Sequence, residues 1–172
     1  MTENKASFLE YVLGINGDIQ LQDALELSLV EIDNLDVAQL DRIGLATYAE
    51  GKWSVHKILQ HLTDWERIWC YRAVILARAE GTVPGGLDEE IMGMNSNADE
   101  LSIEHLVKDL RIVRQSTILL FESFSKEMLE KICVFFAYEM PLYGIGYSIT
   151  AHQIHHFNII KERYVPLIDA VD

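Results

Sequence analysis

Histidines are the side chains of this sequence best suited to chemistry at neutral pH. There are six of them: His56, His61, His105, His152, His155 and His156. A neutral imidazole binds divalent metal ions through either of its ring nitrogens. A metal site needs several imidazoles directed at one point, so the first question is which of the six face the interior.

His152 and His156 are four residues apart in a stretch with helical periodicity. At about 100° of rotation per residue, both fall on one face with the apolar Ile149 and Ile160. His155 falls at the edge of that face. Two imidazoles one helical turn apart can be directed at a single point, which makes a two-nitrogen platform for a metal ion.

A third inward imidazole is predicted on an earlier helix. His61 shares a face with Ile58 and Trp65. His56 falls on the opposite side, which predicts that it faces solvent, and His105 lies off the inner face of a third helix. Three nitrogens from two facing helices would leave coordination positions open for water or substrate, as in catalytic sites.

A metal site is one of two interpretations of this pattern. A buried histidine is commonly a hydrogen-bonded core residue, and each buried imidazole needs partners for its polar nitrogens. Spacing and helical faces alone leave both interpretations open. The sequence has no phosphate-binding loop, no HExxH motif and no Ser-His-Asp arrangement.

The elements that would hold these histidines are helices. Apolar periodicity and the scarcity of Pro and Gly predict four long helices, over residues 18–33, 54–79, 102–124 and 146–164. A short extra helix fits residues 8–13 and a helical turn fits residues 38–43, whereas residues 125–143 could be extended or irregular. We therefore predict an all-α fold, a four-helix bundle in one domain over residues 1–172 with its core in about 18–168.

Composition restricts the classes of function. The 172 residues are 49% hydrophobic, which suffices for a core, and carry a formal net charge of −13, which argues against nucleic acid as a partner. No apolar stretch approaches the length of a membrane span, and residues 1–16 lack the features of a signal peptide. Two cysteines without CxxC spacing, Cys70 and Cys133, predict reduced thiols in a cytoplasmic protein.

Two segments together resemble a known family. The first is Trp53-Ser-Val-His-Lys-Ile-Leu-Gln-His61-Leu, at the start of the second long helix, and the second is His152-Gln-Ile-His155-His156, near the C-terminus. In this combination and order they resemble the DinB/YfiT-like superfamily of four-helix bundles. The resemblance covers residues 18–168.

The resemblance implies a divalent metal ion held by His61, His152 and His156. His155 matches an adjacent histidine of the family that is not the usual ligand. Imidazole nitrogen suits zinc, nickel, copper and iron, of which we expect zinc or nickel. The family also implies a homodimer.

For activity, the resemblance implies a metal-dependent thiol S-transferase. Such an enzyme joins a low-molecular-weight thiol to a small-molecule substrate. The alternatives are a metal-dependent hydrolase and a non-catalytic, metal-containing module that binds a ligand or serves a stress response. No residue is assigned as catalytic, since the sequence offers no obvious general base.

Several residues near the expected site have open roles. Asp64 lies one turn from His61 and is a candidate hydrogen-bond acceptor for a ligand imidazole. Arg72 and Arg163 both fall on inner faces, and Arg163 is expected to reach solvent at the end of its helix. Trp65 and Trp69 are expected in the core or in the wall of a pocket.

Overall fold

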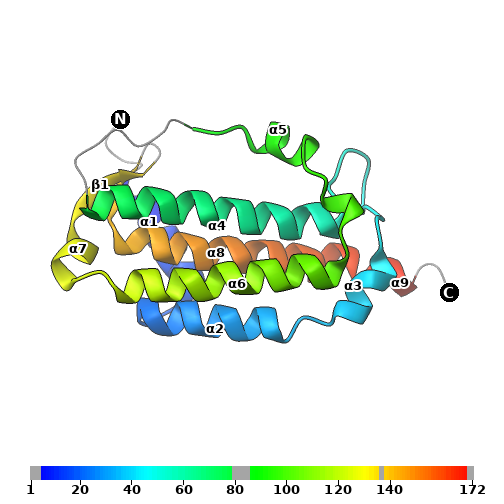
Figure 1. Ribbon diagram of the computed structural model, residues 1–172, viewed down its shortest axis with the longest axis horizontal. Coiled ribbons are helices and arrows are strands. Elements are labelled where there is room, and N and C mark those ends of the chain that lie inside the picture. The colour runs from blue at the N-terminus through cyan, green and yellow to red at the C-terminus, as the bar shows by residue number, and fades with distance from the viewer. Residues whose placement is uncertain (1–4, 79–85, 136–137, 170–172) are drawn as a thin grey trace.

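Four long helices lie side by side and form the body of the molecule (Figure 1). The computed structural model describes residues 5–78, 86–135 and 138–169. The four helices are α2 (Leu21–Asp33), α4 (Val55–Arg78), α6 (Ile103–Glu122) and α8 (Tyr143–Ile159). They confirm the predicted all-α four-helix bundle. None of the described helices is long and apolar enough to cross a membrane.

Shorter elements lie around this body. They are α1 (Lys5–Asn16), α3 (Val37–Ile43), α5 (Glu89–Met94), the 3₁₀ turn η1 (Ala98–Glu100), α7 (Lys126–Glu130), β1 (Ile132–Phe135), β2 (Tyr138–Pro141), the π-helical segment η2 (Ile160–Tyr164) and α9 (Pro166–Asp169). The two strands form an antiparallel pair. Figure 1 shows β1 and α7 at one end of the bundle and α3 with α9 at the other.

The predicted short helix near the N-terminus is confirmed as α1, and the predicted turn at residues 38–43 as α3. Residues 125–143 contain α7 and the strand pair, and α8 begins three residues earlier than expected. We did not predict α5, α7, α9 or η1, because elements this short complete too few turns to show a period. The expected helix end at Ala79 and part of the expected loop, Pro84 and Gly85, lie outside the described residues.

Serine caps fix the starts of α4 and α6, as predicted. The Ser54 hydroxyl accepts a hydrogen bond from the Lys57 backbone N–H at 3.2 Å, and Ser102 accepts one from the His105 N–H at 3.2 Å. The Ser54 hydroxyl also donates to Asp99 at 2.5 Å. The turn η1 is thereby attached to the beginning of the helix that carries His61.

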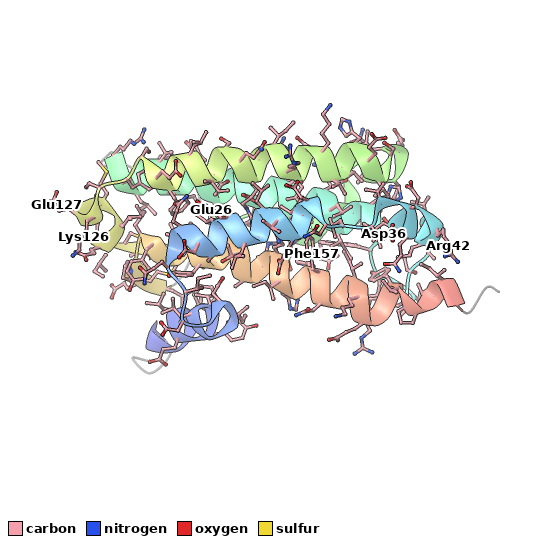
Figure 2. All side chains as sticks on the ribbon, turned by 90° about the horizontal axis from the view of Figure 1, so that it is seen from below. Glu26, Asp36, Arg42, Lys126, Glu127 and Phe157 are labelled. Carbon is pink, nitrogen blue, oxygen red and sulfur yellow. The ribbon has the colours of Figure 1, made fainter. Side chains whose placement is uncertain are left out.

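Helix α8 is enclosed on several sides. It packs against α2, α4 and α1, and residues 144–151 are all buried. Figure 2 shows α1 beside α8, outside the row of long helices. The Tyr147 hydroxyl donates to the Ile19 carbonyl at 2.7 Å, and the Asn16 amide donates to the Tyr147 carbonyl at 3.0 Å. These bonds hold α1 and the turn after it against α8.

The end of α8 continues as the π-helical segment η2. A π turn holds more residues than an α turn, so it rotates the following side chains back around the axis. Tyr164 therefore points inward, where it is 1% exposed and donates to the Trp53 carbonyl at 2.5 Å. Arg163, which a continuous α-helix would have placed on the inner face, is exposed. Its expected contact with solvent is confirmed, with the π turn as the cause.

A buried ion pair lies at the centre of the bundle. Arg114 of α6 is 1% exposed and donates two hydrogen bonds to the Glu66 carboxylate of α4, at 2.8 and 2.9 Å. It also donates to the Ser28 hydroxyl of α2. One guanidinium thus connects three of the four long helices.

Candidate metal centre

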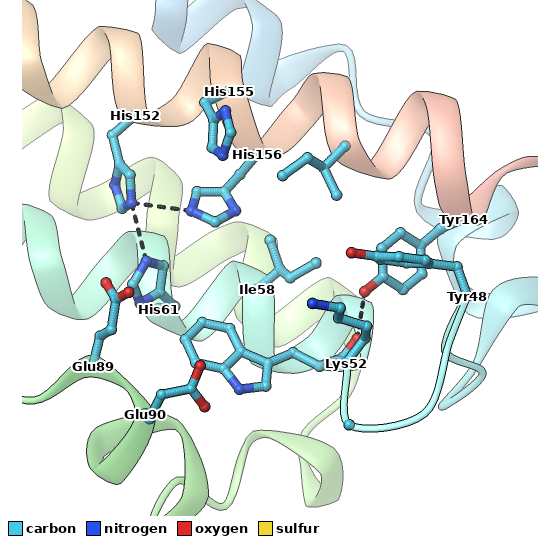
Figure 3. Close-up of a pocket in the computed structure, with 13 residues that line it drawn as sticks. Tyr48, Lys52, Ile58, His61, Glu89, Glu90, His152, His155, His156 and Tyr164 are labelled. Carbon is cyan, nitrogen blue, oxygen red and sulfur yellow. Dashed lines mark hydrogen bonds between the residues drawn. The ribbon is translucent and has the colours of Figure 1, made fainter.

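Three histidines come together between α4 and α8. The Nε2 atom of His152 lies 3.0 Å from the Nε2 of His61 and 3.1 Å from the Nε2 of His156 (Figure 3). One ligand nitrogen from each ring lies within 4.8 Å of the others. The three residues that the sequence analysis selected are therefore the three that meet.

The two separations from His152 Nε2 fit a shared metal ion, and the third pair of nitrogens lies within 4.8 Å. Imidazole nitrogens bind zinc at about 2.0–2.1 Å, so two nitrogens on one ion lie no more than about 4.2 Å apart. The distances of 3.0 and 3.1 Å satisfy this limit. Within the described ranges, no carboxylate or thiol belongs to the group. An ion bound here would have three nitrogen ligands from the protein and further positions for other ligands.

Burial keeps the three rings neutral at physiological pH. Desolvation lowers the pKa of His61 to about 4 and that of His156 to about 3. Burial also lowers the pKa of His152 well below its usual range, with a further contribution from the neighbouring histidines. His156 Nδ1 is buried and has no hydrogen-bond partner within the described part of the chain. Neutral imidazole is the form that binds a metal ion.

These low pKa values predict that the metal-free protein loses stability in mild acid. The unfolded chain takes up protons on these histidines near pH 6.5, whereas the folded chain resists protonation until about pH 4 or 3. Between these limits the unfolded state binds more protons, so the free energy of unfolding falls with falling pH. The contribution of each histidine is at most about 1.4 kcal/mol per pH unit.

Urea denaturation of the metal-free protein at several pH values from 7 to 4.5 measures this effect. His156→Ala removes one of the three low-pKa groups and should make the dependence shallower. His105→Ala, which removes an exposed histidine outside the group, should leave it unchanged. Equal slopes for wild type and His156→Ala would contradict the prediction.

The other three histidines lie outside the group. His105 and His155 are exposed. The prediction that His56 faces solvent is wrong, because it is only 9% exposed and its Nδ1 lies 3.0 Å from the Leu101 carbonyl. The chain between η1 and α6 crosses this side of α4 and covers it.

Three other residues considered in the sequence, Asp64, Arg72 and Cys70, lie outside the group of three histidines. Asp64 accepts a hydrogen bond from Gln60 at 2.9 Å and lies 3.6 Å from Arg67, so it is held by these two side chains and not by a ligand imidazole. Arg72 is buried outside the histidine group. Cys70 lies outside the histidine group and shares a 3.2 Å hydrogen bond with Thr117, and burial raises its pKa to about 12, which disfavours the thiolate at neutral pH.

The tryptophans form walls near the histidines. The ring centroids of Trp69 and His152 are 5.1 Å apart, and those of Trp65 and His61 are 6.1 Å apart. Trp53, which precedes α4, has its ring 4.9 Å from that of His61. The expectation of a pocket wall is met for Trp69, which lines a cavity.

A cavity of about 350 Å³ opens beside the histidines, and we call it the polar cavity. Figure 3 shows Lys52, Glu89 and Glu90 around it, with Glu89 beside His61 and Lys52 on the side of Tyr48 and Tyr164. These three charged residues were not predicted from the sequence. Asp88 could have indicated the start of α5, because its side chain caps this helix by accepting a hydrogen bond from the Ile91 N–H at 3.1 Å. A cap does not indicate which residues the helix packs against.

Comparison with known proteins decides the family. A model of the DinB superfamily matches residues 20–160. The chain belongs to the DinB superfamily. Among solved structures, a similar DinB-type bundle is YfiT from Bacillus subtilis, described as a probable metal-dependent hydrolase with an unusual four-helix bundle topology. It aligns with a TM-score of 0.56 and 16% identity over 95% of this chain and 89% of YfiT. No curated protein matches the chain.

Proposed function

We propose that this DinB-superfamily protein is a metal-dependent S-transferase that joins a low-molecular-weight thiol to an electrophilic small molecule. The observation that carries the proposal is the group of three converging Nε2 atoms beside the polar cavity. His61, His152 and His156 would hold the ion, zinc or nickel in our expectation. When bound, a divalent ion lowers the pKa of a coordinating thiol and so supplies a thiolate at neutral pH.

The protein side chains would serve mainly to bind the thiol. Small biological thiols carry amino and carboxylate groups, and the polar cavity offers an amine from Lys52 and carboxylates from Glu89 and Glu90. No general base is required from the protein once the thiol is ionised. With an organic halide as the electrophile, a sulfur–carbon bond forms and the carbon–halogen bond breaks. The halide leaves with the bonding electrons, and the thiol proton passes to solvent.

Conjugation assays test this proposal. Protein loaded with zinc or nickel should accelerate the reaction of cysteine, glutathione or 2-mercaptoethanol with 1-chloro-2,4-dinitrobenzene or benzyl chloride. The acceleration should be lost in His156→Ala, which removes a converging nitrogen, and retained in His105→Ala, since the exposed His105 lies outside the group and does not line the polar cavity. Absence of conjugation across the whole panel would overturn the proposal.

Metal-dependent hydrolysis is a second candidate, favoured by the description of YfiT. The same three histidines would hold the ion, and water would replace the thiol as the nucleophile. Turnover of ester or amide substrates without any thiol would support this candidate. Tight binding of a small molecule without turnover would instead support a non-catalytic module.

A further inference from the structure

A second cavity, of about 210 Å³, lies between α1, α4 and α8, and we call it the apolar cavity. Its walls include Phe8, Val12 and Ile15 of α1, Trp69 of α4 and Ala151 of α8. It differs from the polar cavity in position and in the chemistry of its lining.

The lining suits an uncharged ligand. Apart from the histidines, the polar groups are few: Ser148 already donates to the Gly144 carbonyl at 2.7 Å, and Tyr11 is largely exposed. The buried Trp69 Nε1–H has no hydrogen-bond partner within the described part of the chain, so it offers one donor for a ligand oxygen. A charged group placed here would lose its hydration without a paired opposite charge.

The volume suits a single ring. An apolar cavity of about 150 Å³ engineered in another protein binds benzene. At about 210 Å³, the apolar cavity has room for a benzene ring with a short substituent.

The apolar cavity adjoins the candidate metal centre. His152 and His155 line both cavities. The ring centroids of Trp69 and His152 are 5.1 Å apart. A molecule with its ring between α1 and α8 can therefore extend a short substituent towards the three Nε2 atoms.

We infer that the apolar cavity binds the uncharged aromatic part of the electrophilic substrate, while the thiol occupies the polar cavity. This inference rests on the proposed function and names its substrate class. Two cavities of unlike polarity that share His152 suit two substrates of unlike polarity. Helix α1, through Val12 and Ile15, then determines which electrophile is accepted.

Binding of an unreactive probe to the metal-free protein tests the cavity separately from the reaction. Toluene should bind with a dissociation constant below about 1 mM, and benzoate should bind at least about tenfold more weakly. Saturation-transfer NMR and quenching of tryptophan fluorescence measure both. Absence of saturable toluene binding, or equal binding of benzoate, would overturn the inference.

Two variants of α1 locate the site. Ile15→Phe places a ring in the cavity and should weaken toluene binding by about tenfold, whereas Leu13→Phe makes the same kind of change on the same helix away from the cavity and should leave it within about twofold. If Ile15→Phe fails to fold, Ile15→Ala serves instead, since it enlarges the cavity and should raise affinity for naphthalene about fivefold. Equal affinities in wild type and both Ile15 variants would overturn the inference.

Activity separates the two proposals. If Ile15→Phe weakens toluene binding but no metal-loaded protein catalyses conjugation, the transferase proposal is overturned and the aromatic site is supported. If neither Ile15→Phe nor Leu13→Phe changes the rate of benzyl chloride conjugation, the aromatic site is overturned and the transferase proposal is supported. With both proposals correct, Ile15→Phe reduces kcat/KM for benzyl chloride but not for iodoacetamide, which has no ring.

Discussion

Replacing His152 with alanine should reduce the metal content of the purified protein from about one ion per chain to nearly none. His152 occupies the middle of the group, with its Nε2 3.0 and 3.1 Å from the other two nitrogens. Without it, an ion has only the nitrogens of His61 and His156 as protein ligands, and the nitrogen that lies close to both is missing. Elemental analysis of protein produced without a histidine tag measures the effect.

The matched control for this change is His155→Ala. His155 lies on the same helix but is exposed and outside the group of converging nitrogens, so its removal should leave the metal content unchanged. Circular dichroism would verify that both variants fold. Equal metal content in wild type and His152→Ala would refute the assignment of the centre.

Replacing Glu66 with glutamine should lower the free energy of unfolding by about 3–5 kcal/mol. The change leaves Arg114, which is 1% exposed, with a buried positive charge and no carboxylate beside it. Chemical denaturation measures the loss. It should be among the largest effects of any single polar substitution in the bundle.

The comparison for Glu66→Gln is a surface pair. Asp109→Asn removes the carboxylate that lies 2.7 Å from the exposed Arg67, and should cost no more than about 1 kcal/mol. The double variant Glu66→Gln with Arg114→Met removes the unpaired charge and should recover much of the stability. A loss below about 1 kcal/mol in Glu66→Gln would show that water or another group compensates Arg114.

The inward placement of the three histidines could be predicted because they lie on long helices, whereas their selection as a ligand set came from the family resemblance. A period of 3.6 residues specifies a face over several turns, and His61, His152 and His156 all lie on faces marked by apolar neighbours. Periodicity cannot show what covers the opposite face. For His56, a connecting segment covers that face, so the prediction of exposure failed.

The parts that could not be predicted depend on contacts between distant segments. Glu66 and Arg114 are 48 residues apart in sequence, and nothing local marks them as partners. The polar cavity depends on α5, which has only six residues and no measurable period. The π-helical turn shifts the register of Arg163 and Tyr164 by a change in backbone hydrogen bonding that side-chain pattern does not encode.

Helix α1 has a consequence for how substrate range can change. The match to the family model begins at residue 20, so α1 lies outside the matched segment, whereas His61, His152 and His156 lie within it. If α1 selects the electrophile, the choice of substrate and the chemistry reside in separate parts of the chain. Substitutions in α1 would then diversify the substrates without altering a metal ligand, and grafting α1 between relatives would exchange their preferences.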